Sequence, residues 1–129
     1  MTLKTIDEEN GMKYHNLLLE WEKEFEGLGV NITLLTNDSQ ERLDEIKRLY
    51  HSNIVYKNGE GLQIFKDSIH DYNVYGNVYR QVRPCLWLYN EDTLVANSRR
   101  INSKSLMKID SVIRSLKCRT QILKFLEKF

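Results

Sequence analysis

The sequence has very little alanine, proline and cysteine: one alanine, one proline and two cysteines in 129 residues. Cys85 and Cys118 lie far apart and in no Cys-x-x-Cys or Cys/His spacing, which argues against a zinc site and against a disulfide-dense scaffold. No run of about 18 apolar residues is present, and no basic-then-apolar leader opens the chain. We therefore expect a soluble, cytoplasmic protein with two reduced thiols.

The scarcity of alanine has a counterpart in the residues that replace it. Lysine, asparagine, isoleucine and tyrosine are abundant, and all four have AT-rich codons. This composition indicates a gene from an AT-rich genome, such as that of many bacteriophages or low-GC bacteria. If the protein is viral, we expect to find it in the host cytoplasm.

Periodic apolar residues predict three helices. The first carries one apolar stripe over residues 14–28, with Thr5 and Glu8 at the spacing of a capping box before it and two glycines after it. The second extends from the turn at residues 37–39 to about Tyr50. The third begins at Asn102 or Ser103 and continues to the end of the chain, with Leu106, Ile109, Val112, Ile113 and Leu116 on its apolar side.

The segments between the helices alternate in apolar and polar residues, as strands do. We expect strands at residues 30–36, 72–82, 85–89 and 93–96, and a hairpin of residues 54–57 and 62–66 around the Asn-Gly-Glu-Gly turn. At 129 residues the chain is of single-domain size, so residues 1–129 are expected to form one domain. The predicted fold class is α+β in the order αβα-βββββ-α, with a mainly antiparallel sheet of about four to six strands packed with three helices.

Charge is divided unevenly along the chain, although its formal net value is only +1. Residues 1–71 carry 14 acidic and 8 basic side chains, net −6, whereas residues 72–129 carry 4 and 11, net +7. Such polarity governs association rather than fold. A partner with a negative surface is therefore expected to approach the second half.

The stretch 72–83 is rich in tyrosine, asparagine and arginine. If it forms one strand, its valines point to one face, and Tyr75, Tyr79 and Arg83 point to the other. Trp87 on the next strand shares that second face if its neighbouring leucines join the valines, and Arg80 belongs to the same stretch. Rings that stack on bases and cations that meet phosphates are the chemistry of single-stranded nucleic-acid binding. The alternative is that a helix covers this face and the tyrosines are packing residues.

A second basic cluster follows the last strand and continues along the final helix. Its members are Arg99, Arg100, Lys104, Lys108, Arg114, Lys117, Lys124 and Lys128. Such a cluster can neutralise phosphates or dock on an acidic protein surface, but it can also be a solvated helix face. Near the C-terminus, apolar residues surround the helix and are a candidate contact with a partner or a second copy: Ile122, Phe125, Leu126 and Phe129.

Signals for catalysis are weak. His70 with Asp71 or Asp67 is the only imidazole–carboxylate grouping, and the sequence has no glycine-rich phosphate loop or nucleophile motif. We expect no metal or cofactor, and a small hydrolase or nuclease is the third alternative. The favoured expectation is a non-enzymatic binding protein whose basic C-terminal half docks on a larger macromolecular partner. If the protein comes from a phage, the expected partner is host RNA polymerase or a defence nuclease, and a nucleic-acid-binding protein is the second alternative.

Overall fold

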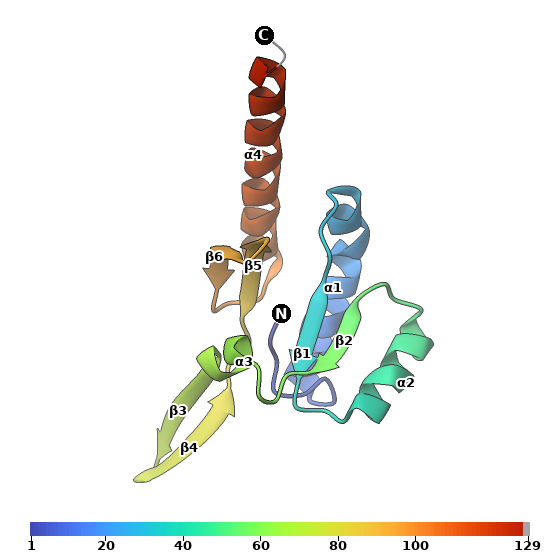
Figure 1. Ribbon diagram of the computed structural model, residues 1–129. Helices are drawn as coiled ribbons and strands as arrows, with labels where there is room; N and C mark the ends of the chain where they lie inside the picture. Colours follow the sequence, from blue (N-terminus) through green and yellow to red (C-terminus); the bar gives the residue numbers. More distant parts are fainter. Residues whose placement is uncertain (128–129) are drawn as a thin grey trace.

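The computed structural model describes the backbone of residues 1–127 and the side chains within that range, except those of Tyr72 and residues 118–127. This part of the chain forms four helices and six strands, which confirms the α+β fold class (Figure 1). The elements are α1 (Glu9–Gly27), β1 (Thr33–Thr36), α2 (Gln40–Tyr50), β2 (Val55–Asn58), α3 (Gln63–Asp67), β3 (Ile69–Val74), β4 (Asn77–Val82), β5 (Leu86–Asn90), β6 (Thr93–Ser98) and α4 (Ser103–Glu127).

The six strands form three two-stranded sheets rather than one continuous sheet. β1 and β2 are parallel and are joined through α2, while β3–β4 and β5–β6 are antiparallel hairpins, as the prediction of mainly antiparallel pairing requires. The N-terminal segment links two of these sheets. Thr2 makes an isolated parallel bridge to Leu35 in β1 and an antiparallel bridge to Cys85, the residue before β5. Residues 1–4 therefore lie between β1 and the start of β5.

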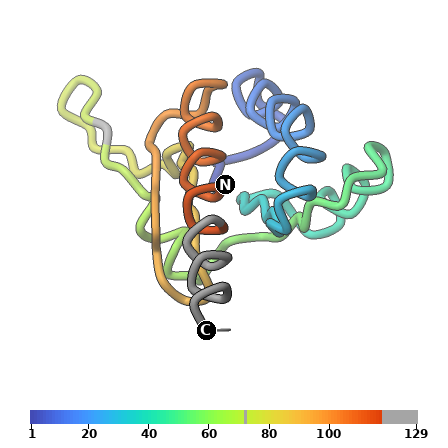
Figure 2. The backbone as a smooth tube through the Cα atoms, turned by 90° about the horizontal axis from the view of Figure 1, so that it is seen from above, coloured from blue at the N-terminus to red at the C-terminus, as the bar shows by residue number. Residues whose placement is uncertain are grey.

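One main hydrophobic cluster joins α1, β1, α2, β5 and α4. Among its buried members are Leu18, Leu34, Leu43, Leu86 and Leu106. Figure 2 shows α1 and α4 as neighbours, and an ion pair of 2.6 Å between Arg114 of α4 and Glu24 of α1 connects them. The cluster places the two longest helices against β1 and β5, so the edges of these strands are held in fixed positions.

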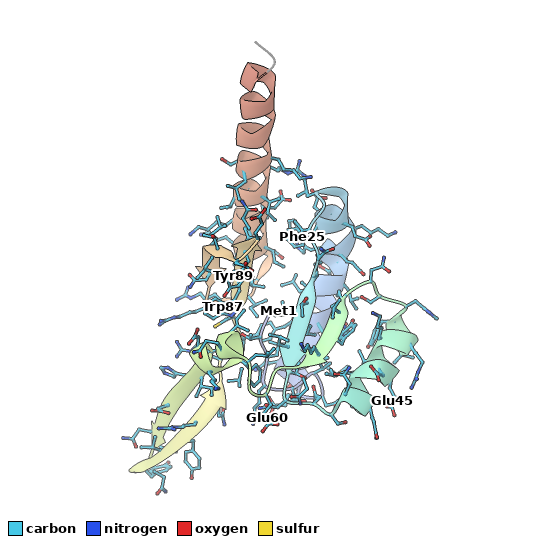
Figure 3. All side chains as sticks on the ribbon, in the orientation of Figure 1. Met1, Phe25, Glu45, Glu60, Trp87 and Tyr89 are labelled. Carbon is cyan, nitrogen blue, oxygen red and sulfur yellow. The ribbon has the colours of Figure 1, made fainter. Side chains whose placement is uncertain are left out.

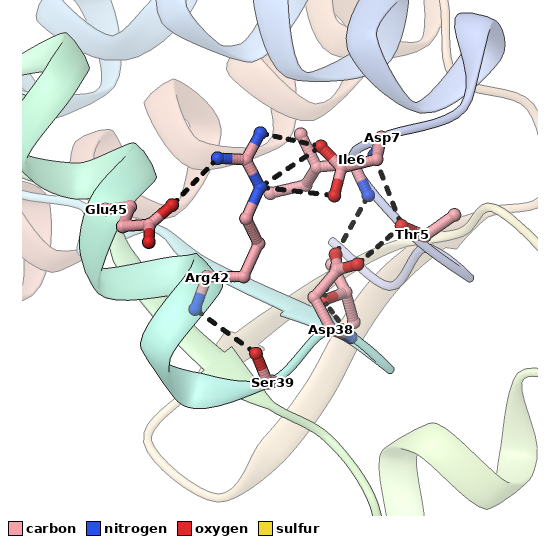
Figure 4. A network of polar contacts seen from close by, with 8 residues as sticks. Thr5, Ile6, Asp7, Asp38, Ser39, Arg42 and Glu45 are labelled. Atoms are coloured by element: carbon pink, nitrogen blue, oxygen red, sulfur yellow. Dashed lines mark hydrogen bonds and ion pairs between the residues drawn. The ribbon is translucent and has the colours of Figure 1, made fainter.

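The start of α1 differs from the predicted capping box. The N-cap residue is Glu8, which makes no side-chain capping bond, and the Thr5 hydroxyl donates instead to the Asp38 carboxylate. The same carboxylate accepts from the backbone N–H of Ile6 at 3.0 Å, and Arg42 binds Asp7 at 2.8 Å (Figure 4). These contacts across the chain hold the N-terminal segment to α2. The hydrogen bond from Arg42 lowers the pKa of the Asp7 carboxyl.

The predicted hairpin of residues 54–57 and 62–66 is wrong. β2 pairs in parallel with β1, and residues 63–67 form the short helix α3. Gly59 explains the change, because a Cβ there would lie 2.5 Å from Cδ2 of Phe65. The chain thus folds Phe65 back onto Gly59, and Phe65 packs with Leu35 and Val82 in a small second cluster.

The stretch predicted as one strand over residues 72–82 is a hairpin arm. Tyr75 and Gly76 have φ values of 51° and 82° and reverse the chain between β3 and β4. The backbone N–H of Gly76 donates to the Asn73 side chain at 3.1 Å, which supports the turn. Figure 1 shows the arm projecting from the body, and none of the four described helices covers it.

The prediction for α4 is confirmed at its start and along its apolar stripe. The Asn102 side chain accepts from the backbone N–H of Ser105 at 2.8 Å, and Leu106, Ile109 and Ile113 are buried. The predicted contact residues Ile122, Phe125, Leu126 and Phe129 lie outside the residues whose side chains are described. Among the described helices, none is both long and apolar enough to cross a membrane.

Candidate functional site

A small polar pocket lies where the hairpin arm meets the β5–β6 sheet. Its volume is about 110 Å³. Residues from α3, β3, β5 and β6 and from the segments that join them line it: Asp67, Ser68, Ile69, His70, Arg83, Cys85, Trp87, Asn97, Ser98 and Arg99. Three of these, Arg83, Trp87 and Arg99, are residues that the sequence predicted to bind a partner. The structure therefore brings together predicted site residues from three separate segments.

Arg83 and Arg99 supply the positive charge of the pocket. The backbone N–H of Arg83 donates to the Ser68 carbonyl at 2.7 Å, which fixes the chain between β4 and β5. Ser98 orders the chain beside Arg99, because its hydroxyl donates to the Arg100 carbonyl at 2.8 Å. Neither arginine forms an ion pair with any described side chain. Two arginines without a bound carboxylate thus line one pocket.

Trp87 is held in place by a chain of hydrogen bonds. Its indole N–H donates to the Thr2 hydroxyl at 3.3 Å, and that hydroxyl lies 2.9 Å from the hydroxyl of Ser68. Ser68 in turn donates to the Ile64 carbonyl at 2.8 Å. Since Thr2 and Ser68 are both buried, these bonds fix the indole at the pocket wall.

Cys85 lies in the same pocket and is buried. Burial raises the pKa of its thiol, while a hydrogen bond with Thr2 and the charges of Arg83 and Arg99 act in the opposite direction. A raised pKa means that the neutral thiol predominates at neutral pH, and the thiol is a far weaker nucleophile than the thiolate.

The imidazole–carboxylate grouping is only partly brought together. Asp67 and His70 line the same pocket, and the Asp67 carboxylate accepts from the Gln63 amide at 2.8 Å. Asp71 follows His70 in β3, so its side chain points to the opposite face, where it pairs with Arg80 at 3.2 Å. Among the residues with described side chains, no group of three or more His, Cys, Asp or Glu could hold a metal ion.

The hairpin arm extends this site on one face. The register pairs His70 with Gln81, and Tyr79 lies two residues from Gln81 on β4, so His70, Gln81 and Tyr79 share a face. Tyr79 is about half exposed, so its ring is accessible next to the pocket. A surface of amide, aromatic and basic groups thus continues from Tyr79 toward Arg83 and Trp87.

The turn at residues 75–76 changes the predicted grouping of side chains. Val74 pairs with Asn77 and lies on the Tyr79 face, not with Val78 as a single strand would require. Tyr75 is fully exposed at the tip of the arm. Trp87 belongs to the β5–β6 sheet, so it shares no strand face with the tyrosines of the arm, and none of those tyrosines whose side chains are described lines the pocket with it.

The other predicted basic residues have different surroundings. Arg100, Lys104 and Lys108 are exposed near the start of α4. Arg114 is bound to Glu24 of α1 at 2.6 Å, a contact that holds α4 against α1, and to Asp110 of its own helix at 2.9 Å. Lys117 lines a separate, larger groove. Lys124 and Lys128 lie outside the residues whose side chains are described.

Several pocket residues were not predicted from the sequence. Ser68, Cys85, Asn97 and Ser98 are common residue types with no motif around them, and they meet only because β3, β5 and β6 converge. Comparison with known proteins adds no further guide: no protein-family model matches the chain, and no curated protein matches it in sequence.

Proposed function

We propose that this protein binds single-stranded nucleic acid without catalysing a reaction on it, through the pocket of Arg83 and Arg99 and the adjoining face of Tyr79. The supporting observation is that two arginines, neither of which forms an ion pair with a described side chain, line one pocket together with Trp87. A volume of about 110 Å³ is that of three to four liquid water molecules, which is room for a phosphate group. Arginine binds phosphate oxygens through two parallel N–H donors, so a phosphate suits this pocket.

The aromatic residues favour a single strand over a duplex. Unpaired bases can stack on accessible rings, and this stacking contributes about 1–3 kcal/mol per base. Tyr79 on the arm and Trp87 at the pocket wall are two such rings, and each lies four residues from Arg83 along the chain. Arg80 on the opposite face of the arm is already paired with Asp71, so the arm itself has little free positive charge for a duplex.

The start of α4 supports a second candidate function, docking on an acidic surface of a larger protein. Arg100, Lys104 and Lys108 are exposed, and none forms an ion pair with a described side chain. No aromatic residue is placed among them to stack on a base. A protein partner would use these charges alone, whereas a nucleic acid would also need Tyr79 and Trp87.

Binding of a fluorescein-labelled oligothymidylate at about 50 mM salt, where phosphate contacts are strong, tests the proposal by fluorescence anisotropy. The double variant Arg83→Ala/Arg99→Ala should bind at least about tenfold more weakly, because two charged hydrogen-bonding groups are lost. The matched control Lys47→Ala/Arg48→Ala removes the same charge from the exposed end of α2 and should bind like the wild type.

Two results would refute this proposal. One is the absence of oligonucleotide binding by the wild type, which would leave the acidic protein partner as the remaining candidate. The other is equal weakening in both double variants, which would mean that only overall charge matters. Thermal unfolding of each variant shows whether it remains folded, and Tyr79→Ala provides a variant outside the pocket that should also bind more weakly.

A further inference from the structure

A groove of about 720 Å³ lies between β1 and β5, separate from the proposed nucleic-acid site except that Trp87 lines both. Figure 3 shows Met1 and Phe25 on one side of this space and Trp87 and Tyr89 on the other. The inner wall comes from the apolar sides of α1 and α4, through Leu18, Phe25, Leu106, Ile109, Ile113 and Leu116. The groove therefore reaches the hydrophobic core.

One side wall is the edge of β5, and the other is the chain that leads into β1 at Thr33. Residues 30–33 line one wall and residues 86–91 the other, in unbroken succession. Successive residues of a strand point to opposite faces, so a wall made of consecutive residues is the backbone edge rather than a face. Both edges thus present peptide groups to the space between them.

Hydrogen bonds to residues 1–4 show which peptide groups of β1 point into the groove. The N–H of Leu35 donates to the Met1 carbonyl, and its C=O accepts from the N–H of Leu3, both at 2.9 Å. The amino group of Met1 donates to the Thr33 carbonyl at 2.9 Å. By the alternation of a strand, the N–H of Thr33 points to the same side as the peptide groups of Leu35. Ile32, just before β1, accepts on the other side from the N–H of Val55 at 2.9 Å, so the same alternation directs the peptide groups of Asn31 into the groove, beyond the reach of residues 1–4.

The edge of β5 mirrors this arrangement. Cys85 exchanges two backbone hydrogen bonds with Thr2, at 2.9 and 3.1 Å. Alternation then directs the peptide groups of Trp87 to the same side as those of Cys85. Residues 1–4 therefore occupy one strand position between β1 and β5, and the groove is the continuation of that position with an open edge on each side.

We propose that this groove accepts an extended strand of a partner protein, which pairs with β1 on one side and with β5 on the other. Unpaired strand edges are templates for such strand addition, in which main-chain bonds give affinity and alternate side chains enter apolar pockets. Every second residue of the partner strand is apolar and faces α1 and α4. The groove continues the position that residues 1–4 occupy as a single strand, so the groove is wide enough for one strand.

The charge at one end of the groove defines the partner further. Lys117 reaches across from α4, and its Nζ lies 3.7 Å from where a Cβ on Gly29 would be. Lys117 forms no ion pair with a described side chain, and Glu91 is the only acidic residue among the described residues that line the groove. An acidic side chain on the partner strand complements Lys117.

The probe is a fluorescein-labelled, C-terminally amidated peptide of seven residues. Its first and last residues are glutamate, and valine and threonine alternate between them. Seven residues cover the usual length of a strand. The wild-type protein should bind it saturably in a fluorescence-anisotropy titration. A peptide N-methylated at two alternate residues should bind at least about tenfold more weakly, because two main-chain donors are lost. Lys117→Gln should weaken binding several-fold, and Lys47→Gln, at an exposed lysine of α2 outside the groove, should not.

Equal binding of the N-methylated peptide would overturn the proposal, because apolar filling alone would then explain the affinity. Absence of saturable binding at millimolar peptide would overturn it as well. A dimer of the protein alone, detected by sedimentation and dissociated by the peptide, would also overturn the proposal. In that case a second copy of the chain would occupy the groove. Oligonucleotide binding by Lys117→Gln should match the wild type, which separates this site from the proposed nucleic-acid site.

Discussion

The dependence of oligonucleotide affinity on salt can be worked out from the basic residues around the pocket. Arg83 and Arg99 line it, and three exposed cations follow closely in the chain: Arg100, Lys104 and Lys108. If all five contact phosphates of a single strand, the slope of log affinity against log salt is about −3.5, at about −0.7 per contact. Between about 50 and 200 mM salt the affinity should therefore fall by about 100-fold.

Removing the two pocket arginines should reduce this slope to about −2.1, so that the same salt increase costs about 20-fold. The measurement is a set of anisotropy titrations at four or five salt concentrations, with the wild type, Arg83→Ala/Arg99→Ala and the control Lys47→Ala/Arg48→Ala. The control should keep the wild-type slope, because its residues lie on α2. A wild-type slope near zero, or an unchanged slope in the pocket variant, would refute the assignment of phosphates to Arg83 and Arg99.

Two further predictions concern the fold that positions the site. Leu106 is 1% exposed, so Leu106→Ala should lower the free energy of unfolding, measured by urea denaturation, by about 2–5 kcal/mol. Leu116 lies at the half-buried groove wall, so Leu116→Ala should lower it by less than about 2 kcal/mol. Equal losses in the two variants would contradict the assignment of Leu106 to a buried stripe. Burial lowers the pKa of His15, whose Nε2 lies 2.6 Å from the Tyr56 hydroxyl, below the ordinary value of 6.5. As the pH falls below 6.5 the unfolded chain therefore takes up a proton that the folded chain does not, and stability decreases. The urea midpoint should fall between pH 8 and pH 5.5, and by less in His15→Gln; an equal fall in both proteins would show that His15 is not responsible.

The helices α1, α2 and α4 and the last hairpin were predictable from the sequence because their signals are local. A continuous apolar stripe identifies α1 and α4, and the alternation around Asn90-Glu91-Asp92 identifies β5 and β6. α3 has only five residues, too few to show a helical period. Leu62 and Ile64 are two residues apart, which is the spacing of apolar residues on one face of a strand. The turn at Tyr75 was missed because tyrosine seldom adopts a positive φ.

Individual residues of the candidate site were predictable from the sequence, but the pocket in which they meet was not. Arg83, Trp87 and Arg99 each stood out by type, but their common pocket depends on the bridge between Thr2 and Cys85 and on the position of Ser68. These contacts join residues more than sixty positions apart, which no local pattern reveals. The parallel pairing of β1 with β2, and with it the groove beside residues 1–4, depends on contacts between separate segments in the same way.

The fluorescence of Trp87 tests the central claim most directly. The chain has two tryptophans, so Trp21→Phe leaves Trp87 as the only one, and Trp87→Phe leaves Trp21, which stacks on Phe25 in α1. Titration of both variants with oligothymidylate at about 50 mM salt should quench the emission of Trp21→Phe, because a base or phosphate then lies against the indole. The emission of Trp87→Phe should stay constant. Saturable binding by anisotropy without any change in Trp87 emission would contradict the account, because the nucleic acid would then bind elsewhere on the protein.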